Sequence, residues 1–230
     1  MSGRSPRWFT GIQYPYEANF ADNTWEQIID ACQRGAVPET WAVGNQKTMT
    51  INGRSYQIDI IGKNHDTYTA GGKAPLTFQL HDCYSEQKNM NSSNTNSGGW
   101  TSCAMRITHL PVILSLMPTE VQNGIREVNK LTSAGNKSST INTTADKLFL
   151  LSEVEIFGST SYSAAGEGTQ YDYYKAGNSK AKKWNGYAAY WWERSPHASN
   201  SALFCLVYSR GDAANYIASI AYSVSFGFCF

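Results

Sequence analysis

Several side chains have the chemistry of metal ligands, but their spacing matches no metal-binding motif. His81, Asp82 and Cys83 are consecutive, and Cys103 and His109 follow downstream. Zinc sites use closely paired ligands such as Cys-x-x-Cys, and the sequence contains no such pair. The aspartates are scattered and lack the spacing of a calcium-binding loop. We therefore predict no metal site and no cofactor, and we interpret these cysteines as core residues.

Nucleophilic catalysis is the second chemistry that the side chains allow. The chain has 5 Cys and 4 His, so a cysteine nucleophile with a histidine base is possible by composition. No local signature singles out one pair. Neither a Gly-x-Gly-x-x-Gly loop nor a Gly-Lys-Ser/Thr phosphate loop is present. The sequence therefore predicts a protein that is not an enzyme and has no catalytic residues.

The composition indicates a polar but weakly charged binding protein. Of 230 residues, 13% are aromatic, including 14 Tyr and 7 Trp, and only 16% are charged, against about 25% in ordinary globular proteins. Tyrosine combined with serine and asparagine is typical of antibody paratopes. The formal net charge is only +1. A nucleic-acid partner is therefore not expected, because such proteins usually carry a basic stripe.

The sequence shows no membrane-spanning run and no visible export signal of its own. No apolar run approaches the roughly 18–20 residues that span a bilayer. The N-terminus, residues 1–22, carries Arg4 and Arg7 but has no apolar stretch of signal-peptide length. The five cysteines are widely spaced, which indicates free thiols or at most two disulfides.

The elements that position these side chains can be predicted from capping and turn signals. A helix begins after Thr24, which has Gln27 three residues on, and ends at Gly35. Two strands flank the turn at Asn52 and Gly53. We further expect a strand over 76–80, a loop over 89–99, helices over 100–116 and after Pro118 (carrying Val121, Ile125 and Val128), a loop over 133–144, a strand within 147–157, a helical turn within 169–177 and strands over 204–207, 218–222 and 224–230. This order predicts one α+β domain over residues 1–230 with a β-rich end.

The last part of the chain, residues 197–230, contains no Lys, Glu, Gln, Met or Trp. The residues before it hold all 11 Lys, 10 Glu, 9 Gln, 5 Met and 7 Trp of the chain. At ordinary usage the tail would contain several of these residues. They are also the five amino acids that no codon ending in cytosine encodes, so the tail is consistent with a gene segment rich in such codons.

The run Tyr-Trp-Trp-Glu-Arg-Ser-Pro at 190–196 precedes this tail. Glu193 and Arg194 beside two tryptophans predict a buried ion pair between rings that fixes the backbone. The alternative is a tryptophan platform that stacks on a sugar.

This run, together with Phe204–Cys205 and the terminal Val-Ser-Phe-Gly-Phe-Cys-Phe at 224–230, resembles the C-terminus of variable proteins from diversity-generating retroelements. The part from Trp25 to Ile156 is similar to an uncharacterised domain of gut bacteria and their phages. In such systems an error-prone reverse transcriptase replaces template adenines, often in AAC codons, and this yields codons that end in cytosine. The resemblance implies a C-type lectin-like fold, shared broadly with formylglycine-generating enzymes, and a binding role without catalysis.

The resemblance also divides the variable region, residues 184–223, and the terminal motif into scaffold and ligand-binding positions. It assigns the residues of 191–196, Phe226 and Gly227 to the scaffold. The residues that it assigns to ligand binding are His197, Ala198, Ser199, Asn200, Ala202, Leu206, Tyr208, Arg210, Asp212, Asn215, Tyr216, Ile217, Ile220, Ala221 and Tyr222. Asn185, Gly186, Tyr187 and Ala189 extend this surface upstream. For Ile217 and Ile220, a place in a core strand fits the sequence equally well.

The function predicted from these observations is ligand display. The chain would be a receptor-binding or adhesin module of a phage particle or a cell surface, with a protein or glycan ligand. One alternative is a lectin-like domain with a fixed glycan ligand. The other is an oxidase of the formylglycine-generating type, which requires a catalytic cysteine pair, and Cys205 and Cys229 are the candidates.

Overall fold

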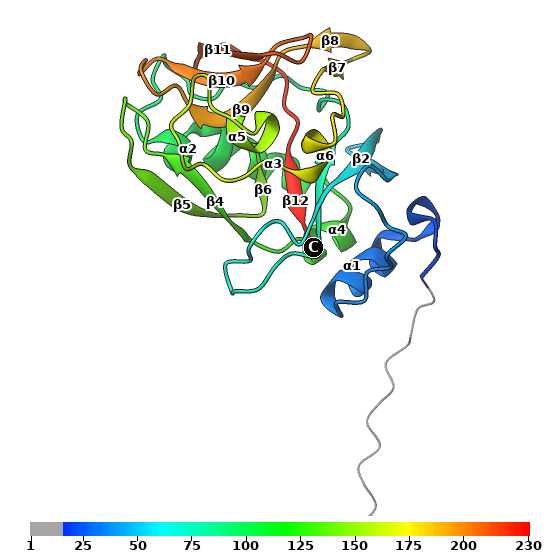
Figure 1. Ribbon diagram of the computed structural model, residues 1–230. Helices are drawn as coiled ribbons and strands as arrows, with labels where there is room; N and C mark the ends of the chain where they lie inside the picture. The colour runs from blue at the N-terminus through cyan, green and yellow to red at the C-terminus, as the bar shows by residue number, and fades with distance from the viewer. Residues whose placement is uncertain (1–15) are drawn as a thin grey trace, which may run out of the picture.

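Small antiparallel sheets dominate the computed structural model, which describes residues 16–230 (Figure 1). The predicted α+β, C-type lectin-like fold is wrong, because the chain is mostly small antiparallel sheets with few helices, 20% helical and 32% strand. No helix in the described part is long and apolar enough to cross a bilayer. The N-terminal stretch in which no export signal is expected is residues 1–22, and its first 15 residues lie outside the described part.

Within residues 16–230, twelve strands form four sheets. The strands are β1 (Gln46–Ile51), β2 (Arg54–Lys63), β3 (Leu76–Leu80), β4 (Val128–Ser133), β5 (Ile141–Asp146), β6 (Leu148–Phe149), β7 (Lys182–Trp184), β8 (Tyr187–Ala189), β9 (Trp191–Pro196), β10 (Leu203–Val207), β11 (Ala213–Ile217) and β12 (Gly227–Cys229). The central sheet has the order β1-β2-β3-β12-β6, and a second sheet has the order β11-β10-β9. β4–β5 and β7–β8 are separate two-stranded sheets.

The helices are short. They are η1 (Phe20–Asp22), α1 (Trp25–Gln33), α2 (Gly99–Ser102), the π-helical turn η2 (Met105–His109), α3 (Leu110–Ser115), α4 (Thr119–Gly124), α5 (Glu153–Phe157) and α6 (Asp172–Lys175). In Figure 1, the β9–β10–β11 sheet lies at one end of the molecule and α1 at the other.

The predictions for the N-terminal elements are confirmed where local signals were strong. α1 begins with the expected capping box, in which Thr24 and Gln27 satisfy each other's backbone N–H groups. Asn52 and Gly53 both have positive φ, 48° and 74°, as a tight hairpin turn between β1 and β2 requires. The strand predicted over 76–80 is β3, and the helical turn within 169–177 is α6.

The predicted helix over 100–116 is wrong, because the segment is three short pieces, α2, η2 and α3. Cys103 has extended backbone angles, φ −68° and ψ 149°, and ends α2. Pro111 lies in the first turn of α3, where its missing N–H is tolerated. Further along, α4 ends at Gly124, and Val128 begins β4 instead of continuing a helix.

Three more predicted elements need correction. The segment 133–144 was predicted as a loop but contains the start of β5, whose polar residues pair with β4. The segment 147–157 contains the two-residue β6 and then α5, which begins with a capping box between Ser152 and Glu155. The strand expected over 218–222 lies earlier, as β11, because a turn at Tyr208–Asp212 closes the hairpin with β10.

The terminal motif belongs to the core. β12 pairs with β3 on one side and β6 on the other, so it is a central strand. Phe78 of β3 lies 5.2 Å from both Phe228 and Phe230, measured between ring centroids, and Trp25 of α1 lies 6.0 Å from Phe230. These buried rings connect α1, the central sheet and the end of the chain.

Candidate functional site

Most of the predicted ligand-binding residues surround the β10–β11 hairpin. β10 pairs with β9 on one side and β11 on the other, so β11 is an edge strand. The predicted residues that are exposed are Ser199, Asn200, Arg210, Asp212, Tyr216, Ile220 and Ala221. Those that are half-buried are His197, Ala198, Ala202, Tyr208, Asn215, Ile217 and Tyr222. We call these fourteen residues the display surface.

Two predicted ligand-binding residues do not belong to this surface. Leu206 is fully buried in β10, where its register partner on β9 is Trp192. Ala189 is also buried, at the end of β8 opposite Lys182. β10 is the middle strand of its sheet, and its stretch from Phe204 to Val207 is buried throughout. Leu206 and Ala189 are therefore scaffold residues, and their assignment to ligand binding is corrected.

The upstream extension lies on a separate hairpin. Asn185, Gly186 and Tyr187 are exposed at the tip of β7–β8, and Tyr187 keeps 78% of its surface accessible. This tip borders a hollow of about 280 Å³, whose lining includes Arg54 and Lys183. Of the two isoleucines with alternative interpretations, Ile220 is exposed and Ile217 is half-buried, so neither is a core residue.

Four tyrosines form a connected aromatic cluster within and beneath the display surface. Tyr216 and Tyr222 have ring centroids 5.1 Å apart, and Tyr222 contacts Tyr190 at 5.3 Å. Tyr190 in turn contacts Tyr208 at 4.5 Å. The guanidinium of Arg210 lies 5.3 Å from the ring centroid of Tyr208. Sequence reasoning missed Tyr190, which belongs to the motif run and joins the two halves of this tyrosine cluster.

Hydrogen bonds between hydroxyls complete the tyrosine cluster. Burial and a hydrogen bond with Tyr216 raise the pKa of Tyr222 to about 12. A hydrogen bond with Tyr208 raises the pKa of Tyr190 above its ordinary value. These hydroxyls therefore stay protonated at neutral pH and keep both donor and acceptor capacity for a ligand.

Asn96 holds the turn between β9 and β10 through main-chain atoms. Its buried side-chain amide Nδ2 donates to the carbonyl oxygens of His197, Asn200 and Leu203 at 3.3, 3.0 and 2.8 Å. Its Oδ1 accepts from the Asn136 N–H at 2.7 Å. The sequence predicted the segment 89–99 as a loop but gave no sign of this role.

The rest of the loop over 88–96 holds the segment after β11 in the same way. The N–H groups of Met90 and Asn91 both donate to the Ala218 carbonyl at 3.0 Å. Lys88 and Tyr222 exchange two backbone hydrogen bonds, of 2.9 and 3.1 Å. Since these contacts use backbone atoms of the display surface, the side chains of that surface do not take part in them.

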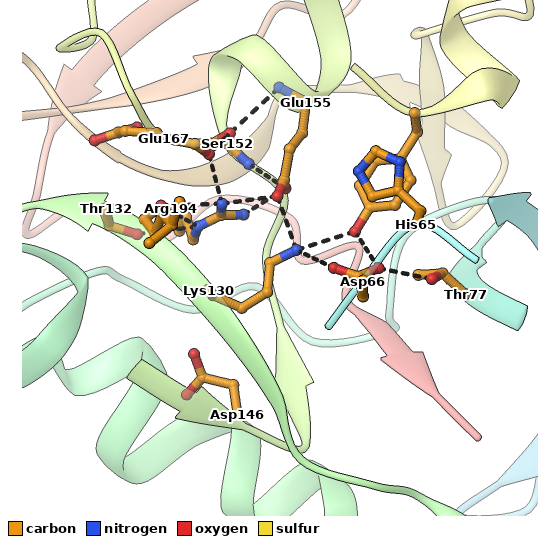
Figure 2. A network of polar contacts seen from close by, with 12 residues as sticks. His65, Asp66, Thr77, Lys130, Thr132, Asp146, Ser152, Glu155, Glu167 and Arg194 are labelled. Atoms are coloured by element: carbon orange, nitrogen blue, oxygen red, sulfur yellow. Dashed lines mark hydrogen bonds and ion pairs between the residues drawn. The ribbon is translucent and has the colours of Figure 1, made fainter. Parts of the chain in front are cut away.

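Arg194 connects β9 to the interior (Figure 2). Its guanidinium forms a bidentate pair with Glu155, with Nη2 at 2.8 Å from Oε1, and also donates to the carbonyls of Leu131, Leu150 and Glu167. The predicted pairing with Glu193 is therefore wrong. Both carboxylate oxygens of Glu193 are buried without a hydrogen-bond partner among the described residues.

The Arg194 site continues as a chain of buried charges (Figure 2). Lys130 Nζ lies 2.8 Å from both Glu155 Oε1 and Asp66 Oδ1. Asp66 also accepts hydrogen bonds from Thr77 at 2.6 Å and Tyr171 at 2.8 Å. Burial alone would raise the pKa of both carboxyls, but Lys130 lowers that of Asp66 to about 2, and Arg194 and Lys130 lower that of Glu155. Both carboxylates are ionised and shielded from solvent, which fits a structural role.

A family model, Domain of unknown function (DUF6273), matches residues 75–226. The chain belongs to this family. The matched DUF6273 segment begins just before β3 and includes Asn96, Arg194 and the whole display surface. Neither the search of curated proteins nor the search of solved structures found a match.

The thiols of this DUF6273 chain are buried singly. All five cysteines are free, and burial raises the pKa of Cys32, Cys83 and Cys103 to about 12. Cys205 lies in β10 and Cys229 in β12, in different sheets, and burial raises the pKa of both well above the ordinary value. The cysteine pair that the oxidase alternative requires is therefore not formed. Among the described residues, no three His, Cys, Asp or Glu side chains gather as metal ligands.

Proposed function

We propose that this chain is a ligand-binding module whose display surface varies in sequence while its backbone is held in place. The observation that carries the proposal is the separation of contacts in the tail. Main-chain atoms at His197, Ser201 and Ala218 are bonded to the loop over 88–96, whereas the fourteen side chains of the display surface are exposed or half-buried.

This separation is what a variable surface needs in energetic terms. Changes at exposed positions usually alter the free energy of unfolding by less than about 0.5 kcal/mol. Changes of buried side chains cost about 2–5 kcal/mol each. With fourteen exposed or half-buried positions beside a fixed backbone, the chain can accept new side chains without a new fold.

The composition of the tail supports a specific source of variation. The residues after Pro196 use only amino acids that codons ending in cytosine encode. Replacement of adenines in AAC codons during reverse transcription produces this set. The partner would be a protein or glycan on a cell surface, and the module would act as an adhesin or receptor-binding domain of a phage particle or cell.

The DNA around the gene tests this proposal. We expect a near-copy of the segment that encodes 184–223, close to a reverse-transcriptase gene, with differences only at adenines of the copy. We further expect these differences in codons of the display surface, and the same codons for Leu206 and Ala189 in both copies. Absence of the repeat, or codons ending in A or G across the display surface, would refute the diversification.

A further inference from the structure

β11 is an edge strand, and its outward N–H groups have no hydrogen-bond acceptor among the described residues. Two hydrogen bonds show which opposite residues of β10 and β11 bond to each other. They run from Ala218 N–H to Ala202 O at 3.0 Å and from Tyr208 N–H to Asp212 O at 2.7 Å. In this pairing Ala214 and Tyr216 bond to β10. The N–H groups of Ala213, Asn215 and Ile217 point outward, and no described residue accepts a hydrogen bond from them.

β11 also lacks the features that normally prevent strand pairing at an edge. Its sequence, Ala-Ala-Asn-Tyr-Ile, contains no charge and no proline, and its register with β10 is regular. Proteins usually protect an edge with Lys, Pro, a bulge or a very short strand. The edges of the central sheet follow this rule, since β1 carries Lys47 and β6 has two residues. The open edge of β11 is therefore a distinct feature of the display surface.

We propose that the ligand is a protein, and that an extended segment of it pairs with β11 as an additional strand. This inference rests on the proposed binding function. Outward donors and acceptors on alternate residues repeat about every 6.8 Å along a strand. Another extended main chain matches this repeat, whereas the hydroxyls of a sugar do not.

Strand addition suits a surface with variable side chains. Main-chain hydrogen bonds supply affinity that does not depend on the sequence of either partner, and the side chains beside them supply specificity. On this surface Tyr216 and the turn residues Arg210 and Asp212 flank the edge. Variation of these side chains would change which segment binds, while the backbone of β11 would bind each one in the same way.

Selection of linear peptides from a random display library on the immobilised chain tests this inference, with a glycan array as the parallel arm. Asn215→Pro removes one outward N–H, and proline is tolerated at an edge strand. Asn215→Ala removes the same side chain but keeps the N–H. We expect Asn215→Pro to weaken binding of selected peptides by about tenfold or more, the effect of one lost hydrogen bond that leaves its acceptor unpaired. Asn215→Ala measures the loss of the side chain alone, so it should bind about tenfold or more tightly than Asn215→Pro.

Amide hydrogen exchange supplies a second readout. The amides of Ala213, Asn215 and Ile217 should exchange rapidly in the free chain and become protected when a selected peptide binds. Equal affinities for the two Asn215 variants, or unchanged exchange in the complex, would overturn strand addition. Glycan binding that depends on Tyr216, with no peptide selected, would overturn it and leave the proposed function intact. If neither a peptide nor a glycan binds, the result contradicts both strand addition and the proposed function. Protection of these amides in a dimer of the chain would overturn the peptide ligand and assign the edge to self-association.

Discussion

Arg194 satisfies its hydrogen-bond donors inside the protein and thereby connects β9 to α5, β4 and the segment around Leu150. Its Nε donates to Thr132 Oγ1 at 3.0 Å, in addition to the pair with Glu155 and the three carbonyls. The sequence motif indicated that this arginine is buried and paired. It could not identify Glu155 as the partner, because 39 residues separate the two and only the fold brings them together.

Replacement of Arg194 should destabilise the protein strongly. Arg194→Ala leaves Glu155 with Lys130 as its remaining cation and removes the donors to three carbonyls, so we expect a loss of about 3–5 kcal/mol. Arg194→Lys keeps the charge but lacks the planar guanidinium, so its free energy of unfolding should lie between those of the wild type and Arg194→Ala. Urea denaturation gives the free energy of unfolding, with the exposed Arg210→Ala as control at less than about 0.5 kcal/mol. Equal stability of the two alanine variants would contradict the scaffold role.

Glu193 should make stability depend on pH. Burial raises the pKa of its carboxyl well above the ordinary 4.5, and burial raises the pKa of Glu167 to about 7. The folded chain therefore holds protons that the unfolded chain releases, so the stability that these two carboxyls contribute is complete below pH 4.5 and decreases as pH rises toward their folded-state pKa values. Glu193→Gln should reduce this slope by up to about 1.4 kcal/mol per pH unit. Denaturation curves between pH ~5 and ~8 measure the slope; an unchanged slope would show that Glu193 is ionised in the fold.

Tyr216 and Tyr222 should respond differently to replacement. Tyr216 is 43% exposed, so Tyr216→Ser should keep the melting temperature and weaken ligand binding, since a few aromatic residues usually dominate an interface. Tyr222 is half-buried, with its ring centroid 5.4 Å from that of Trp192, so Tyr222→Ser should lower the melting temperature. Tyr222→Phe is the matched control for packing. Loss of stability in Tyr216→Ser would place that ring in the core.

At the scale of elements, the loop over 88–96 is a support for the display surface. Asn96→Ala removes the donor to three turn carbonyls and should destabilise the chain by about 1–3 kcal/mol. The effect should concentrate in the turn, so amides of 197–203 should exchange faster than those of β12. Asn94→Ala is the control, because Asn94 accepts one exposed hydrogen bond, from Ser219. Uniform acceleration in both elements would indicate global unfolding instead.

Elements with local chemical signals could be predicted, and those set by tertiary contacts could not. Thr24 and Gln27 define the start of α1, and Asn52 and Gly53 define the first hairpin, because capping and turn geometry depend on adjacent residues. β5 is rich in polar residues, so only its pairing with β4 makes it a strand. The segment around Cys103 has the composition of one helix, and its break depends on contacts that the sequence does not reveal.

At the scale of the molecule, scaffold and display surface should tolerate change unequally. Simultaneous replacement of Ser199, Asn200, Asp212 and Ala221 by other small polar residues should shift the melting temperature by only a few degrees, since each position is exposed. Leu206→Ser alone should have a larger effect, because it buries a hydroxyl and leaves a cavity in β10. Thermal denaturation followed by circular dichroism gives the melting temperature of both variants. A larger effect of the combined surface variant would show that the two parts are not separate.

The resemblance predicted a region for the candidate surface, but it did not resolve single positions. All residues of the tail come from the same small set of amino-acid types, and the sequence cannot tell that Leu206 is buried while Tyr208 is half-buried. The support from Asn96 was also beyond prediction, because its hydrogen bonds span 101 to 107 residues along the chain.

The position of β12 has a consequence for how the chain is made. A ribosome synthesises β12 after the segment that carries the display surface, yet β12 occupies the place between β3 and β6. A nascent chain that is interrupted or shifted out of frame within that segment lacks the strand and leaves the two halves of the central sheet unjoined. Completion of the sheet thus reports that translation has passed through the whole segment in frame, and defective copies would be left open to cellular proteases.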